Sequence, residues 1–141
     1  MSSLKPICKP KKARSNTPLW NKVSRALQDY YRAMGLECEG RSKSCTGRAE
    51  VMHHCFSFKR YLELRLEEKN LTPLCGHCHH SAHQGIEETR MNYETAMEVK
   101  YGPFWKDGLS LQAREAPHRT RSEERDWLLE KLHFYLQNTS N

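Results

Sequence analysis

Two pairs of cysteines, far apart in the sequence, constrain the fold of this chain more than any other feature. The first pair is Cys38 and Cys45, the second is Cys75 and Cys78, and 29 residues separate the pairs. A zinc ion bound by four thiolates needs two such pairs brought together by the fold, and Cys-x2-Cys is the more specific spacing. We therefore predict a closed, structural zinc site. The alternatives are four separate buried cysteines, or His77 replacing one thiolate, against which its spacing argues.

The other two cysteines, Cys8 and Cys55, stand apart from these pairs. Six cysteines can also form disulfides, but disulfides persist mainly in oxidising compartments. The N-terminus has no apolar run behind it, and no stretch approaches the roughly 18–20 apolar residues of a membrane span. We therefore expect a soluble, cytoplasmic protein with no membrane contact and with reduced thiols. The alternative is a secreted protein stabilised by disulfides.

Histidines crowd the same part of the chain as the second cysteine pair. Six of the eight histidines are His53, His54, His77, His79, His80 and His83. Adjacent residues of a strand point to opposite faces, so His53 and His54 can do different work. Residues four apart on a helix share a face, so His79 and His83 can bind one cation. His80 competes with His79 for this role.

Hydrophobic periodicity and turn residues predict a small α+β fold. The expected elements are a helix from Thr17 to Gly35, strands over 49–54 and 70–74, a short helix over about 61–68, helices over 75–84 and 89–101, and a last amphipathic helix over 122–137. Residues 105–121 are expected to form a loop. With 37% hydrophobic residues, the chain can build only a modest core, which a structural metal would support.

Positive charge is concentrated in the first third of the chain. The net charge is +6, and residues 1–50 hold 11 Lys and Arg against 4 Asp and Glu, whereas residues 51–141 hold 12 against 13. Residues 1–16 are predicted to form a disordered basic arm. This distribution favours contact with a polyanion such as nucleic acid, although a basic tail can also serve solubility alone.

The stretch over residues 70–79, Asn-Leu-Thr-Pro-Leu-Cys-Gly-His-Cys-His, resembles the Asn-Leu-x-x-Leu-Cys-x-x-Cys-His signature of the His-Asn-His (HNH) endonucleases. Residues 49–54 resemble the strand of that family that ends in the general-base histidine. The resemblance covers about residues 36–84 and implies a ββα-metal core. The chain departs from many members in having His53 where they have Asp and His83 in place of a Lys. The histidine pairs look closest to the colicin-type branch, and the cysteine pairs look like the phage and restriction-enzyme branch.

The resemblance also implies roles for individual residues. His54 is implied to be the general base that activates water, and His53, His79 and His83 to bind a catalytic divalent metal ion. Asn70 is implied to hold the loop between the strands and to orient His54. A ligand set made only of imidazoles is softer than one with Asp, so Mn²⁺, Ni²⁺ or Zn²⁺ is expected to be accepted beside Mg²⁺.

The function implied is a DNA endonuclease that hydrolyses phosphodiester bonds, by nicking or by double-strand cleavage. DNA is the implied partner, and a protein partner in recombination, packaging or repair is left open. By analogy with the family, a phage origin and a bacterial host cytoplasm are expected. The alternative is a non-catalytic zinc-binding module for nucleic acid or protein, in which the cysteines matter and His54 does not.

The domain organisation expected from these arguments has four parts. They are the basic arm over 1–16, the HNH domain with its preceding helix over 17–104, the loop over 105–121 and the C-terminal helix over 122–141.

Overall fold

The computed structural model describes residues 15–139, which form five α-helices, two 3-10 turns and a two-stranded antiparallel sheet. The elements are α1 (Thr17–Arg32), β1 (Val51–His54), η1 (Leu62–Leu64), η2 (Glu68–Asn70), β2 (Leu71–Leu74), α2 (Gly76–His83), α3 (Glu87–Tyr101), α4 (Trp105–Glu115) and α5 (Arg121–Asn138). The predicted α+β class is confirmed. Of the predicted basic arm, all but Ser15 and Asn16 lies outside the described residues, as does Cys8. Within residues 15–139, no helix has both the length and the apolar character needed to cross a bilayer.

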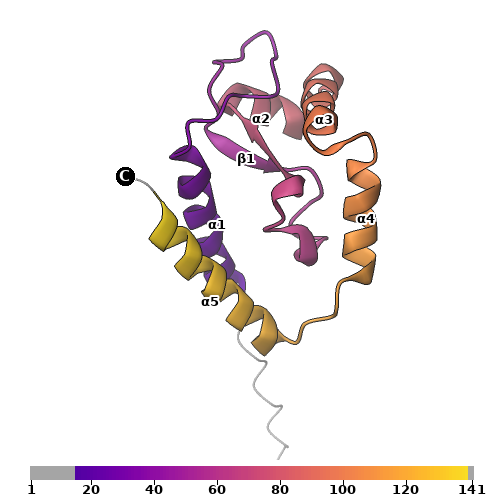
Figure 1. Ribbon diagram of the computed structural model, residues 1–141. Helices are drawn as coiled ribbons and strands as arrows, with labels where there is room; N and C mark the ends of the chain where they lie inside the picture. The colour runs from indigo at the N-terminus through magenta and orange to yellow at the C-terminus, as the bar shows by residue number, and fades with distance from the viewer. Residues whose placement is uncertain (1–14, 140–141) are drawn as a thin grey trace, which may run out of the picture.

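Helices α1 and α5 form a helical pair on one side of the hairpin (Figure 1). Apolar side chains recur on α1 at helical spacing, and Val23 and Leu27 are fully buried. They meet Leu128 of α5 and Met52 of β1 in one hydrophobic cluster. Burial of apolar surface therefore joins the first and last described helices, and the pair packs against β1 through Met52.

The hairpin of β1 and β2 places His53 and His54 beside the strand formed by Leu71–Leu74. Its register pairs His53 with Thr72 and His54 with Leu71. Helix α2 follows β2 directly, so the order is strand, strand, helix. The loop from α1 to β1 runs beside this unit, where Glu37 and Arg48 form an isolated bridge.

The short helix expected over about 61–68 is wrong in type, because the segment forms the two 3-10 turns η1 and η2 instead. The carbonyl oxygen of Leu64 accepts the backbone N–H of Glu67 at 3.2 Å, which closes a 3-10 turn. It also accepts the side-chain amide of Asn70 at 3.0 Å. With this carbonyl so engaged, an α-helix does not continue through the segment.

The loop expected over 105–121 is wrong for most of its length, because Trp105–Glu115 forms α4. Gly108 weakens the helical pattern, since glycine costs about 1 kcal/mol in a helix relative to alanine. Burial overrides that cost: Trp105 and Leu109, four residues apart, pack with Leu64 and Met97 in a second core cluster. Only the short stretch over 116–120 separates α4 from α5.

Candidate metal centres and the histidine cleft

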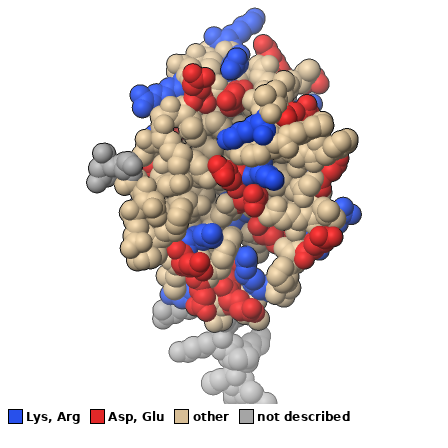
Figure 2. Space-filling view, in the orientation of Figure 1, with Lys and Arg blue, Asp and Glu red and all other residues tan. Residues whose placement is uncertain are grey.

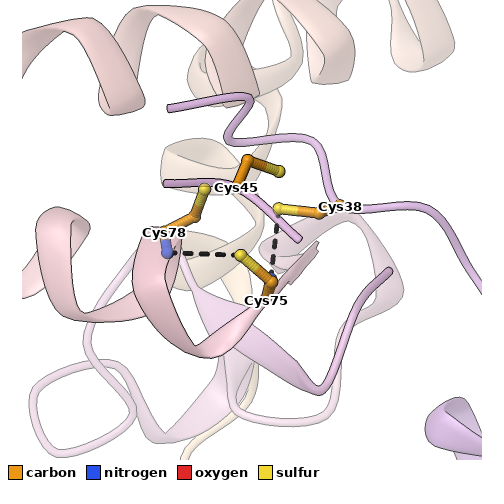
Figure 3. Close-up of side chains that lie close together, drawn as sticks. All are labelled: Cys38, Cys45, Cys75 and Cys78. Atoms are coloured by element: carbon orange, nitrogen blue, oxygen red, sulfur yellow. Dashed lines mark hydrogen bonds between the residues drawn. The ribbon is translucent and has the colours of Figure 1, made fainter. Parts of the chain in front are cut away.

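The four cysteines of the two predicted pairs come together in the structure. Cys38 and Cys45 lie in the loop between α1 and β1, while Cys75 precedes α2 and Cys78 lies in its first turn. Their sulfur atoms all lie within 4.8 Å of one another, and the side chains converge on a common point (Figure 3). Four thiolates at about 2.3 Å from a tetrahedral zinc ion would lie about 3.8 Å apart. The cysteine group can therefore hold a structural metal ion.

Backbone N–H groups point at these sulfur atoms. The N–H of Cys75 donates to Sγ of Cys38 at 3.1 Å, and the N–H of Gly40 donates to the same atom at 3.4 Å. Burial raises the pKa of the Cys38 thiol to about 12. Burial also raises the pKa of Cys75, but hydrogen bonds from Thr46 and Cys78 together outweigh it and lower that pKa to about 6. Such donors favour thiolates, and the charge of a metal ion would favour them further.

Gly40 allows the first cysteine loop to approach α2 closely. A Cβ atom at this position would lie 2.5 Å from Cβ of Cys78, 2.7 Å from its Sγ and 3.2 Å from a side-chain carbon of Leu74. No side chain fits there without moving a cysteine of the group. The side-chain amide of Asn92, on α3, donates to the Gly40 carbonyl at 2.9 Å and braces the loop from the other side.

A second group consists of His53 on β1 and of His79 and His83 on α2. One ring nitrogen from each of the three lies within 4.8 Å of the others, and the Nε2 atoms of His79 and His83 are 2.9 Å apart. His80 and His77 are exposed and lie outside the group. Of the two histidines that compete in the sequence, the structure therefore places His79 beside His53.

Two rings of this group, those of His53 and His79, have lowered pKa values, which favour their uncharged form. Burial, and then the neighbouring His79 and His83, lower the pKa of His53 to about 4. Burial also lowers the pKa of His79. Neutral imidazoles carry the lone pairs that metal coordination requires. Three nitrogen donors in this arrangement could hold a metal ion.

His54 has a different environment from its neighbour. Its Nε2–H donates to the carbonyl oxygen of Arg65 at 2.8 Å. A carbonyl only accepts, so the proton of the neutral ring lies on Nε2 and the lone pair lies on Nδ1. The ring packs 5.2 Å from that of Phe58 and 6.2 Å from that of Trp20. This burial lowers the pKa of His54, so the ring is uncharged near neutral pH.

Asn70 is completely buried, and its side-chain amide makes three hydrogen bonds. Oδ1 accepts the N–H of Phe56 at 2.7 Å, and Nδ2 donates to the carbonyls of Phe56 and Leu64, each at 3.0 Å. Asn70 therefore holds both ends of the segment that follows β1. That segment leads to Arg65, whose carbonyl accepts the hydrogen bond from Nε2–H of His54.

A cleft of about 620 Å³ lies between α1, β1 and α2, and all four histidines, His53, His54, His79 and His83, line it. Although His53 and His54 are adjacent on a strand, both border this space. Ser24 and Gln28 of α1 also line it, as does Tyr93 of α3, whose ring lies 5.5 Å from that of His53. These three residues were not singled out from the sequence. In the sequence, Ser24 and Gln28 are polar residues beside an apolar helical stripe and Tyr93 is an aromatic residue on another, and both patterns are too common to mark a site.

The remaining cysteine among the described residues and two basic residues lie near the site. The five cysteines among the described residues form no disulfide with one another. Cys55 lies outside the cysteine group, and burial raises the pKa of its thiol to about 12, which does not favour a nucleophile. Lys59 and Arg60 are exposed just beyond the cleft residue Phe58.

Comparison of the chain with models of protein families, with curated proteins and with solved structures found no significant match. The geometry of the two groups is therefore the basis on which a function is assigned.

Proposed function

We propose that this protein is a metal-dependent DNA endonuclease of the HNH kind. One observation carries the proposal: a three-histidine group and a fourth histidine with a free Nδ1 lone pair share one cleft of about 620 Å³. Hydrolysis of a phosphodiester needs a base for water and a cation for the charge that develops on the phosphate. The candidate base, His54, and the three candidate metal ligands, His53, His79 and His83, border the same cleft. The order strand, strand, helix supports the proposal further.

In the proposed mechanism, each residue has its own task. His54 accepts a proton from the attacking water at Nδ1, while its Nε2–H stays bonded to the Arg65 carbonyl. His53, His79 and His83 would hold a divalent metal ion, which would supply positive charge to the phosphate and to the leaving oxygen. Asn70 holds in place the loop that positions the Arg65 carbonyl.

DNA is the proposed substrate because the chain is basic, with a net charge of +6. Figure 2 shows a face on which basic and acidic side chains are intermixed. We therefore assign the phosphate contacts to local positive charge next to the cleft, where Lys59 and Arg60 are exposed. The cysteine group, loaded with Zn²⁺, is proposed to support the fold without taking part in the reaction.

Nicking of supercoiled plasmid by the zinc-loaded protein tests this proposal, with Mg²⁺, Mn²⁺, Ni²⁺ or Zn²⁺ added in turn. We expect wild-type nicking with at least one of these ions and a rate about 10²–10⁴ lower for His54→Ala, the usual contribution of a general base. His80→Ala is the matched control, since His80 is exposed on the same helix and lies outside the group. The proposal fails if no ion supports nicking, or if His54→Ala nicks as fast as the control.

A non-catalytic zinc-binding module is the second candidate, and the cysteine group alone favours it. It predicts that Cys75→Ser abolishes binding to nucleic acid or to a protein partner, whereas His54→Ala changes neither binding nor any other activity. The same plasmid assay separates the two candidates, because only the endonuclease requires His54.

A further inference from the structure

Among residues 15–139, strand β1 pairs with β2 along one edge only, and on its other edge a side chain makes the hydrogen bonds that a neighbouring strand would make. The backbone N–H of Met52 donates to Oε1 of Gln28 at 2.7 Å, and Nε2 of Gln28 donates to the Met52 carbonyl at 3.1 Å. Across the hairpin, Met52 is paired with Pro73, and the backbone groups of this pair point to opposite edges of the sheet. The carbonyl of Pro73 accepts the N–H of Glu39 on the other edge. Gln28 therefore satisfies the backbone groups of Met52 that β2 does not.

The histidine pair lies between two such amide contacts. Gln28 binds both backbone groups of Met52, the residue directly before His53. Asn70 binds both backbone groups of Phe56, two residues after His54. Each amide offers one acceptor and one donor, as a peptide group does. Asn70 lies within the stretch over residues 70–79, whereas Gln28 comes from α1, far from that stretch in the sequence.

We propose that Gln28 is a positioning residue for the histidine group, because its amide fixes the backbone of Met52 and thereby the approach of His53 to α2. This inference rests on the proposed function, in which His53 is a metal ligand. Gln28 also lines the cleft, so its contact with Met52 is made at the site itself. Residues that orient metal ligands typically change metal affinity about 10–100-fold when mutated.

The chemistry of this contact requires a glutamine. A carboxylate has no donor for the Met52 carbonyl, and an ammonium has no acceptor for its N–H. Asparagine has the right groups but is one methylene shorter. Gln28 is carried by α1, whose Val23 and Leu27 are held in the core with Leu128 of α5. The helical pair is therefore coupled to the histidine group through the hydrogen bonds of Gln28 as well as through its packing on Met52.

Titration of the full chain with Co²⁺, after the cysteine group is loaded with Zn²⁺, tests this role. Gln28→Met keeps the length and unbranched shape of the side chain and removes both hydrogen bonds. Gln28→Asn keeps a polar amide, and it serves as the second variant should the first fail to fold. The matched control is Ala26→Gly, which lowers the helix propensity of α1 from a buried position in the same core cluster but removes neither hydrogen bond to Met52. Calorimetry measures the Co²⁺ affinity, and the zinc content of each protein is measured alongside.

We expect both Gln28 variants to bind Co²⁺ at least about tenfold more weakly than the wild type, with their zinc content unchanged and Ala26→Gly unaffected. Wild-type affinity in folded Gln28 variants would overturn the role of Gln28 and leave the proposed endonuclease standing. An equal loss in Ala26→Gly would overturn it too, since stability of α1 would then explain the effect. If the wild type binds no Co²⁺ beyond the zinc-loaded cysteines, both proposals fall.

Discussion

Single side chains around the histidine cleft are held in place by contacts that local sequence does not reveal. The His54 ring is set by the carbonyl of Arg65, eleven residues away. The loop that carries this carbonyl is held by the amide of Asn70, which no water reaches. At the scale of the residue, we expect the largest effects from changes at the buried polar residue Asn70 and at Gly40, where the backbone approaches Cys78 closely.

Asn70→Ala removes the acceptor for the Phe56 N–H and the donor for the Phe56 and Leu64 carbonyls. Buried groups left without partners cost about 1–3 kcal/mol each, so we expect the free energy of unfolding to fall by about 2–4 kcal/mol. Urea denaturation measures this change. Asn138→Ala is the matched control, because its amide bonds to the Phe134 carbonyl at an exposed helix end. A similar loss in both variants would contradict the role given to Asn70.

Gly40→Ala should disrupt the cysteine group, because the new Cβ would lie 2.5 Å from Cβ of Cys78. We expect the purified variant to contain less zinc and to have a lower Tm. Gly108→Ala is the control, since nothing lies within 4 Å of its added Cβ. That change, within α4, should raise stability by up to about 1 kcal/mol. Full zinc content in Gly40→Ala would show that the loop can move away from α2.

At the scale of the element, the hydrophobic pattern predicted most of the helices and both strands, because their apolar residues repeat with the period of the element. It failed for α4, where Gly108 and few apolar residues weakened the pattern and packing of Trp105 and Leu109 decided the outcome. It also failed between Tyr61 and Glu68, where hydrogen bonding to Asn70 competes with an α-helix. Local helix propensity predicts the structure poorly where core packing or a buried hydrogen bond competes with it.

The contact of α5 with α1 depends on Leu128, which is fully buried. Leu128→Ala should lower the free energy of unfolding by about 2–5 kcal/mol, because it leaves a cavity in the cluster that joins both helices to Met52. Leu136→Ala, on the same helix but 66% exposed, should change stability by less than about 0.5 kcal/mol. Thermal and urea unfolding compare the two. Equal effects would mean that α5 does not pack on α1 in solution.

At the scale of the whole molecule, the cysteine group ties the α1–β1 loop to the start of α2. Cys38, Cys75 and Cys78 also belong to a buried cluster with Leu74 and Tyr93. In a chain with a modest core, binding of a metal by these residues contributes directly to the free energy of folding.

Chelation of the metal should therefore lower Tm and expose the thiols of the cysteine group. We expect these four thiols to be shielded from a thiol reagent in the native protein and to react fully after chelation, with release of about one zinc ion per chain, the content of a four-thiolate site. Thiol titration with a zinc indicator measures both quantities. Thiols that stay unreactive in the denatured, chelated protein would instead mean disulfides and would contradict the metal site.

The sequence by itself determined the α+β class and the order strand, strand, helix, because period and turn residues act over a few positions. The spacing of the cysteines, and for the histidines the resemblance to the HNH endonucleases, also predicted which side chains would come together, and metal binding by them stays a prediction. Only the tertiary structure decided that His79, not His80, faces His53, that the His54 proton lies on Nε2, and that Gln28 covers the edge of β1. These outcomes depend on which surfaces meet, and no local period encodes a contact between segments tens of residues apart.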